Sequence, residues 1–179
     1  MKYLALLRGI NVGGNNLISM AELRRCLEDA GLKNVSTYIQ SGNVLFESSA
    51  RDPARLASKI ESILTARFGY TALIVLVSAD ELGAVVDGAP DGFGDDAAEY
   101  RYDVIFIRRP FQAREVRSTL KLKEGVDEAS ANDHAIYCRR LISKAGQSHF
   151  PKIVSHRAYK SMTIRNWNTT CKLHQLMNQ

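Results

Sequence analysis

The sequence predicts an α+β protein made of two ferredoxin-like (βαββαβ) subdomains packed together, with an additional C-terminal helix. Three observations predict this fold. Short apolar runs alternate with segments of helical periodicity, the same order of elements recurs after residue 100, and an acidic stretch rich in glycine separates the two series. We place the subdomains at residues 1–88 and 101–179, with an acidic linker at residues 89–100.

The first series opens with residues 3–7, which are apolar on both faces of the expected strand. Such a strand should be covered on both faces. Ser19 and Glu22 have the spacing of a capping box, so a helix should begin there. Apolar residues then recur at helical spacing as far as Gly31, which should end this helix.

The remaining elements of the first series follow closely. Residues 35–40 and 44–46 are expected to form two short strands joined by a hairpin turn. Asp52 and Pro53 suit the N-cap and first position of a second helix. Residues 73–77 should form the fourth strand, again apolar on both faces.

The second series repeats this order without a residue-level repeat, so the duplication is inferred from topology. A short helix opened by a capping box at residues 78–81 and an exposed connection at 88–100 precede it. The expected elements are a strand at 102–107, a helix at 113–122, a weak strand at 126–131, a strand at 135–139, a helix within 146–159, a strand at 162–164 and a last helix at 166–177.

Charge is distributed unevenly along the 179 residues, although the net charge is only +5. Residues 1–79 hold nine Lys and Arg against six Asp and Glu, residues 80–100 hold none against seven, and residues 101–179 hold fifteen against six. Residues 134–179 contain eight Lys and Arg, all four histidines and no acidic residue. This pattern is typical of a surface for a polyanion or a phosphate. The alternative is a solvated basic face that keeps the protein soluble.

The three cysteines, Cys26, Cys138 and Cys171, are odd in number and form no CxxC pair. This argues against a disulfide framework or a zinc site and fits a reducing compartment. No apolar run approaches the roughly 20 residues of a membrane helix, and the N-terminal apolar run is too short for a signal peptide. We therefore expect a cytoplasmic protein that has no metal and no cofactor.

The glycine-rich loop RGINVGGNN, at residues 8–16, is a first candidate for a ligand site. Glycine and asparagine tolerate positive φ, and a loop that leads into a helix presents backbone N–H groups that favour anions. The loop has neither GxGxxG spacing nor the lysine of a P-loop, so it is not a nucleotide fingerprint. The alternative is a long connection whose glycines serve geometry alone.

A second candidate is TIRNWNTTCKL, at residues 163–173. In a helix that extends from Arg165, the side chains of Asn168 and Lys172 would share its face at i+3 and i+7. Such donors suit a phosphate or a polar base edge. Trp167 is either a stacking platform or a core anchor.

We expect these two segments and the hairpin turn to meet in one groove between the subdomains, because each is rich in Gly, Asn, Ser or Arg. Ser143 and Lys144 follow a basic pair and add a hydroxyl and a cation, unless they only form a turn after a strand. The candidate ligand-binding residues are Arg8, Asn11, Gly13, Gly14, Ser41, Asn43, Ser143, Lys144, Arg165, Asn168 and Lys172. We expect Arg165 and Lys172 to be exposed.

Four motifs together resemble one widespread bacterial family, catalogued as domain of unknown function 1697. These motifs are RGINVGG, SMAELRRCLEDAG, YIQSGNVLFES and TIRNWNTTCKL. The resemblance extends over essentially the whole chain. It implies two ferredoxin-like subdomains in tandem, and it implies no activity and no cofactor.

Enzyme signatures such as HExxH and the GxSxG elbow are absent from the sequence. His149 and His156 have no carboxylate near them in the sequence, and we interpret them as surface histidines. Stacking of RNA bases on an open sheet is disfavoured, because the strands are apolar on both faces. Three classes remain: a protein that binds nucleic acid or a phosphate-bearing ligand, which we prefer, an enzyme acting on a small phosphorylated metabolite, and an interaction module for an acidic partner.

Overall fold

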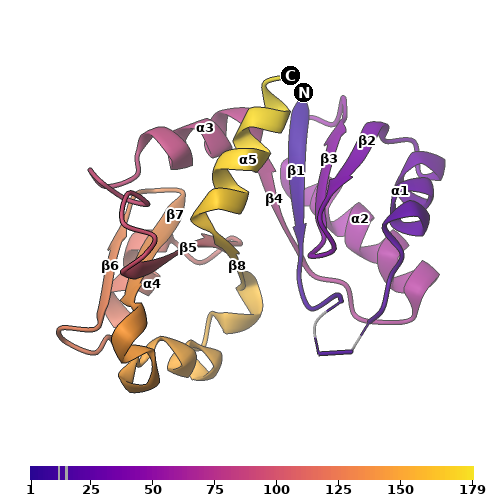
Figure 1. Ribbon diagram of the computed structural model, residues 1–179. Coiled ribbons are helices and arrows are strands. Elements are labelled where there is room, and N and C mark those ends of the chain that lie inside the picture. The colour runs from indigo at the N-terminus through magenta and orange to yellow at the C-terminus, as the bar shows by residue number, and fades with distance from the viewer. Residues whose placement is uncertain (12, 15) are drawn as a thin grey trace. The chain divides into compact units, whose positions relative to one another are not determined.

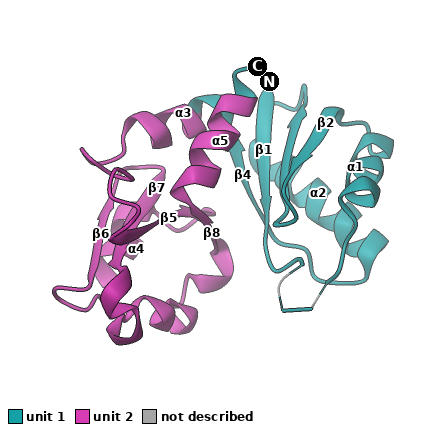
Figure 2. Cartoon of the chain, in the orientation of Figure 1, with its two compact units in different colours: residues 1–80, 177–179 teal, residues 81–176 magenta. Residues whose placement is uncertain are grey.

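The computed structural model describes residues 1–11, 13–14 and 16–179, which form two compact units (Figure 2). The first unit contains residues 1–80 and 177–179, and the second contains residues 81–176. Each unit has a four-stranded antiparallel sheet with flanking helices, so the predicted α+β fold is confirmed. None of the described helices is long and apolar enough to cross a membrane.

The first unit has the predicted order βαββαβ (Figure 1). Its strands lie in the sheet order β2-β3-β1-β4, which is the ferredoxin-like arrangement. The elements are β1 (Lys2–Leu7), α1 (Met20–Asp29), β2 (Lys33–Tyr38), β3 (Asn43–Glu47), α2 (Pro53–Phe68) and β4 (Ile74–Ser78).

Both helices of this unit begin where the sequence predicts. The hydroxyl of Ser19 accepts a hydrogen bond from the Glu22 backbone N–H at the start of α1. The carboxylate of Asp52 accepts from Ala54 and Arg55 at the start of α2, and Pro53 takes the first helical position. Short polar side chains therefore fix the two points at which the chain turns from loop to helix.

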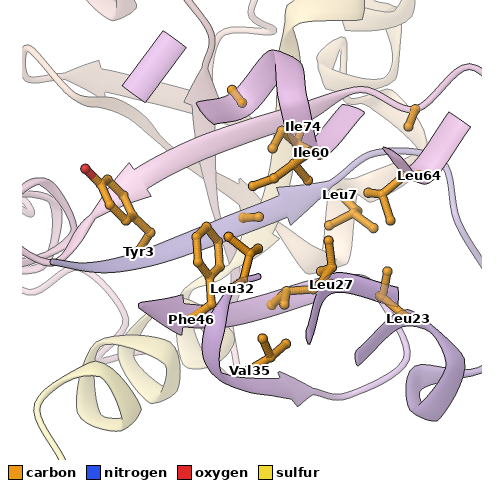
Figure 3. Packing of buried hydrophobic residues seen from close by; sticks show 14 of the residues in the cluster. Tyr3, Leu7, Leu23, Leu27, Leu32, Val35, Phe46, Ile60, Leu64 and Ile74 are labelled. Carbon is orange, nitrogen blue, oxygen red and sulfur yellow. The ribbon is translucent and has the colours of Figure 1, made fainter. Parts of the chain in front are cut away.

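The core of the first unit lies between the sheet and the two helices (Figure 3). Tyr3 and Leu7 of β1 point into this core with Leu23 of α1 and Leu64 of α2. Leu4 and Leu6, which alternate with these residues along β1, are also fully buried. Both faces of this strand are therefore covered, as its double apolar pattern predicts.

The second unit repeats the sheet order of the first, as β6-β7-β5-β8. Its regular elements are α3 (Ala79–Asp87, which starts two residues before the unit), β5 (Tyr100–Ile107), α4 (Ala113–Thr119), β6 (Asp127–Ala131), β7 (Ala135–Leu141), β8 (Met162–Asn166) and α5 (Trp167–Met177). Three short 3-10 helices connect β7 to β8, and they are η1 (Ile142–Gln147), η2 (Phe150–Ser155) and η3 (Tyr159–Ser161).

The α-helix predicted within residues 146–159 is wrong, because this segment forms only 3-10 turns. Pro151 lies at the start of η2 and has no backbone N–H to donate to a preceding turn. Ser148, between η1 and η2, is extended with φ −59° and ψ 139°. A continuous helix therefore cannot pass through this segment, and the second unit lacks the counterpart of α2.

The acidic stretch between α3 and β5 is mostly exposed, but one of its side chains packs on the second sheet. The ring of Phe93 makes edge contacts with Tyr102, Tyr137 and Trp167, at centroid distances of 4.9, 5.5 and 5.2 Å. Gly94 lies so close to Trp167 that a Cβ would be 2.2 Å from its ring. Trp167 is therefore a packing anchor in this unit, one of its two predicted roles.

Gly42, in the β2–β3 turn, provides a test of the packing at the end of β1. Its φ is +73°, and a Cβ there would lie 2.7 Å from Leu7 Cβ and 2.8 Å from Ile10 Cδ1. We expect Gly42→Ala to lower the free energy of unfolding by about 2 to 3 kcal/mol, because it adds a clash to the cost of positive φ. Chemical denaturation measures this loss.

Gly69→Ala is the matched control, because Gly69 has φ +69° and a Cβ added to it would have no atom within 4 Å. The free energy of unfolding of this variant should fall by only about 1 to 2 kcal/mol, which is the cost of positive φ for a residue with a Cβ. Equal losses in the two variants would contradict the packing described for Gly42.

Candidate anion-binding site

Asn11 makes a framework of hydrogen bonds around the described part of the glycine-rich loop in the first unit. The Asn11 Nδ2 donates to the carbonyls of Ile18 (3.0 Å) and Gln40 (2.9 Å), and its Oδ1 accepts from the Ile18 N–H (2.8 Å). Asn11 adopts φ +52°, which asparagine tolerates better than other residues with a Cβ. The amide of Asn11 is thus used in joining the loop to the β2–β3 turn.

The hairpin residues serve the same framework. Asn43 is fully buried, and its Nδ2 donates to the Tyr38 carbonyl (3.0 Å) and the Ser41 hydroxyl (2.9 Å). Arg8 is half-buried, and its backbone N–H donates to the Leu73 carbonyl. Four of the predicted residues, Arg8, Asn11, Ser41 and Asn43, therefore gather at one end of the first sheet.

Gly13 and Gly14 are exposed and have positive φ, as the loop chemistry predicts. Val12 and Asn15 of the same motif lie outside the described residues.

Arg165 is not on a helix, which corrects the predicted polar face of α5. It lies in β8, because Asn166 ends the strand and caps α5 by accepting from the Thr169 N–H at 2.7 Å. Arg165 is also buried rather than exposed, and its Nη1 donates to Thr163 Oγ1 (2.8 Å) and the Ile164 carbonyl (2.9 Å). Burial lowers its pKa to about 10.

The other predicted residues of the second unit are accessible. Ser143 and Lys144 are exposed in η1, Asn168 is exposed in the first turn of α5, and Lys172 is half-exposed on the same helix. Asn168 and Lys172 remain one turn apart, but Arg165 does not extend their stripe. The convergence of all three segments across a groove between the subdomains stays a prediction.

The second unit contains a hollow that the sequence did not indicate, which we call the α4–η2 pocket. Its volume is about 360 Å³, and it lies between the end of α4 with the turn after it and the segment around η2. Pockets of this size bind compact organic ligands. The lining residues are Thr119, Leu120, Lys121, Leu122, His149, Phe150, Lys152, Ile153, Ser155, His156 and Arg157.

The pocket follows from the missing second helix of this unit. In the first unit α1 packs against the 16-residue α2, and the two helices cover one face of the sheet. In the second unit three short 3-10 helices take the place of α2, and the six-residue η2 among them buries only Ile153. A shorter and narrower element fills less space beside α4.

One buried carboxylate fixes both walls of the α4–η2 pocket. Asp127 is 5% exposed, and its Oδ1 accepts from the Ser148 hydroxyl at 2.6 Å. Its Oδ2 accepts from the backbone N–H groups of Lys123 (3.0 Å) and His149 (2.8 Å). Lys123 follows the wall formed by residues 119–122, and His149 belongs to the opposite wall. Asp127 therefore sets the position of both segments.

These contacts also determine the protonation of Asp127. Burial alone would raise the pKa of the carboxyl, but the hydrogen bonds from Ser148, Lys123 and His149 and the charge of Arg140 outweigh burial. The pKa lies below its ordinary value of 3.8, so the carboxylate is charged at neutral pH.

Both ring nitrogens of His156 form hydrogen bonds in the pocket wall. Its Nδ1 accepts from the Ala158 N–H at 3.1 Å, so in the neutral ring Nε2 carries the proton. The Nε2–H donates to Thr119 Oγ1 at 2.9 Å, and the Thr119 hydroxyl donates to the Val116 carbonyl. Both nitrogens of His156 are thus used within the protein, whereas no hydrogen bond of the His149 ring is found among the described residues.

Positive charge in the pocket comes from its lysines. Lys121 and Lys152 are exposed and form no ion pair with any described residue, and no carboxylate lines the pocket. Arg157 pairs with Glu115 at 2.6 Å, which offsets its charge. Among the described lining residues, the positive charge that no ion pair offsets therefore comes from Lys121 and Lys152.

The basic segment 134–179 is more neutralised than its sequence suggests. Arg139 pairs with Glu128 at 2.8 Å, and Arg140 lies 3.9 Å from the carboxylate of Asp103. These carboxylates come from earlier parts of the chain, so a local count of charges overlooks them. The exposed lysines of the segment, including Lys152, supply its remaining unpaired charge.

The interpretation of His149 and His156 as surface histidines is incomplete, because both are half-buried and line the pocket. Their spacing of seven residues is visible in the sequence, but spacing alone does not reveal the turn at Pro151 that places them. Cys138 is buried, and burial raises the pKa of its thiol, with the nearby Asp103 adding to the effect. Among the described residues, no group of three or more potential ligands is placed to hold a metal ion.

We expect Asp127→Asn to lower the stability of the second unit by about 2 to 3 kcal/mol at pH 7, because an amide cannot accept all three hydrogen bonds of the carboxylate. Asp133→Asn, which alters an exposed partner of Arg114, is the control and should change stability little. Chemical denaturation of both variants measures the effect.

The stability difference between the wild type and Asp127→Asn should depend on pH. The pKa of Asp127 is lower in the folded state than its ordinary value. The carboxylate therefore contributes its full stabilisation above the ordinary pKa, and this stabilisation is lost as the pH falls through the folded-state pKa. The difference in stability between wild type and Asp127→Asn should therefore shrink as the pH falls below about 4. A difference that grows in acid would contradict the charged, hydrogen-bonded carboxylate.

Comparison with known proteins places the chain in a family. A search of curated proteins gives no match. The fold is similar to that of a solved structure described as the conserved bacterial protein SP0830 from Streptococcus pneumoniae, with a TM-score of 0.84, 29% sequence identity and 98% of each chain covered. A family model matches residues 1–137, which is more than half of the chain. The chain therefore belongs to the family described as Protein of unknown function (DUF1697).

Proposed function

We propose that the protein binds a phosphate-bearing ligand in the α4–η2 pocket. The observation that carries this proposal is a hollow with two unpaired lysines at its rim and no carboxylate among its lining residues. Lysine ammonium groups are compact point charges with three donors each, and they bind phosphate oxygens in many sites. Cytoplasmic location, expected from the sequence, would give access to such ligands.

The C-terminal end of α4 lies beside the pocket, and free carbonyl groups at such an end would repel an anion. Several of these carbonyls already accept hydrogen bonds. At the end of α4, the hydroxyls of Ser118 and Thr119 donate to the carbonyls of Glu115 and Val116. The Leu120 N–H donates to the Arg117 carbonyl. These bonds satisfy carbonyl oxygens that would otherwise present negative partial charge.

Nucleic acid is the second candidate, favoured by the basic segment 134–179. Lys144, Lys152 and Lys160 are exposed in it, spread over η1, η2 and η3. A strand of nucleic acid bound along these turns would give affinity that falls steeply with salt. The neutralised arginines of the segment reduce the charge available to such a polymer, so we rank the small ligand first.

We expect the double variant Lys121→Ala/Lys152→Ala to weaken phosphate binding at least about tenfold, because each ammonium supplies a charge-assisted hydrogen bond. Both side chains are exposed, so the fold should be retained. Phosphorus NMR of inorganic phosphate titrated with protein at low salt measures the affinity.

A second double variant, Lys33→Ala/Lys59→Ala, removes the same charge from exposed positions in the first unit. It should bind phosphate as the wild type does. An equal loss in both double variants would show a general effect of net charge, and an absence of binding by the wild type would reject the proposal. Fluorescence anisotropy of labelled RNA and DNA across salt concentrations tests the second candidate.

A further inference from the structure

We infer that the α4–η2 pocket selects a phosphate monoester with a compact apolar or aromatic body, in preference to inorganic phosphate, polyphosphates or a nucleic acid backbone. This inference rests on the proposed function, because it specifies the ligand of the same pocket.

The walls of the pocket are the first reason. Between the cationic rim residues lie Leu120, Leu122, Phe150 and Ile153, all of them partly or fully buried. An ion surrounded only by water and lysines would leave this apolar surface without a partner. A ligand with an apolar body covers it and gains about 25 cal/mol for each Å² removed from water.

The volume is the second reason. At about 360 Å³, the pocket lies near the lower end of the range of roughly 300 to 1,000 Å³ that is typical of sites for organic ligands. It has room for more than a phosphate group, which requires a further part of the ligand. It has less room than a large cofactor needs, which limits that part to a single ring or a short chain.

The charge is the third reason. Lys121 and Lys152 contribute about +2, while the charge of Arg157 is offset by Glu115 at 2.6 Å. A phosphate monoester carries about −1.5 to −2 at pH 7, which matches this local charge. A polyphosphate would bring excess negative charge that the described lining residues do not balance.

The two histidines define how the ligand meets the walls. His156 cannot donate to a phosphate, because its Nε2–H is directed to Thr119 Oγ1 and its Nδ1 accepts from Ala158. Its ring contributes a flat surface to the wall. The His149 backbone is fixed by Asp127, and its imidazole is available to the ligand together with the ammonium of Lys152.

The test compares three probes by isothermal titration calorimetry: phenyl phosphate, inorganic phosphate and phenol. We expect phenyl phosphate to bind about tenfold more tightly than inorganic phosphate and phenol to bind weakest. Leu122→Asn keeps the side-chain size but makes this part of the wall polar. It should reduce the affinity for phenyl phosphate much more than the affinity for inorganic phosphate. Leu120→Gln provides a second, independent change in the same wall.

The outcomes separate this inference from the proposed function. If inorganic phosphate and phenyl phosphate bind equally and neither wall variant changes the affinity, the inference is overturned and phosphate binding stands. If neither phosphate compound binds, both fail. If phenol binds as tightly as its phosphate ester, the pocket recognises only the apolar body, and the inference is again overturned.

Discussion

The hydrogen bonds of Asp127 are the constraint on which the second unit depends. Donors from two segments, the Lys123 N–H on one side and the Ser148 hydroxyl and His149 N–H on the other, all meet this one carboxylate. Ser148 and His149 lie inside the β7–β8 connection, which has only 3-10 turns and little helical hydrogen bonding of its own. The carboxylate replaces the support that a longer helix would supply, and it holds open a pocket that the turns alone would not define. Stability and the geometry of the pocket are therefore linked through one buried charge.

The two units show how one topology produces a filled core in one place and a hollow in another. Both have the same strand order, and both place their crossover elements on one face of the sheet. In the first unit the 16-residue α2 covers that face, with Ile60 and Leu64 buried in the core. In the second unit the chain is extended at Ser148 and then forms only the short η2, whose six residues leave Leu120, Leu122 and Phe150 only partly covered. The pocket thus arises from a local departure within a repeated fold, at a position where the lysines and histidines of both walls face a common space.

Much of the fold could be predicted because local chemistry sets it. The caps at Ser19 and Asp52, the double apolar pattern of β1 and the order of the first six elements depend on residues close together in sequence. The site was harder to predict. Asn11 and Asn43 have the composition of a ligand site, but their amides are used to hold the loops, and this is visible only from their partners. Helical spacing extends α5 back to Arg165, whereas the cap at Asn166 starts the helix later. The pocket could not be predicted, because it depends on how α4 and η2 lie in space, and these elements are about 30 residues apart in the chain.

The α4–η2 pocket is the proposed site of phosphate binding. Chemical-shift mapping of the backbone amides with phenyl phosphate tests this proposal most directly, because the shift of each amide changes when a ligand binds near it. We predict shifts concentrated in residues 119–122 and 149–157, with the amides of the first unit unchanged and the shifts lost in Lys121→Ala/Lys152→Ala. Shifts centred on the glycine-rich loop of the first unit, or none in the segments that line the pocket, would contradict the claim.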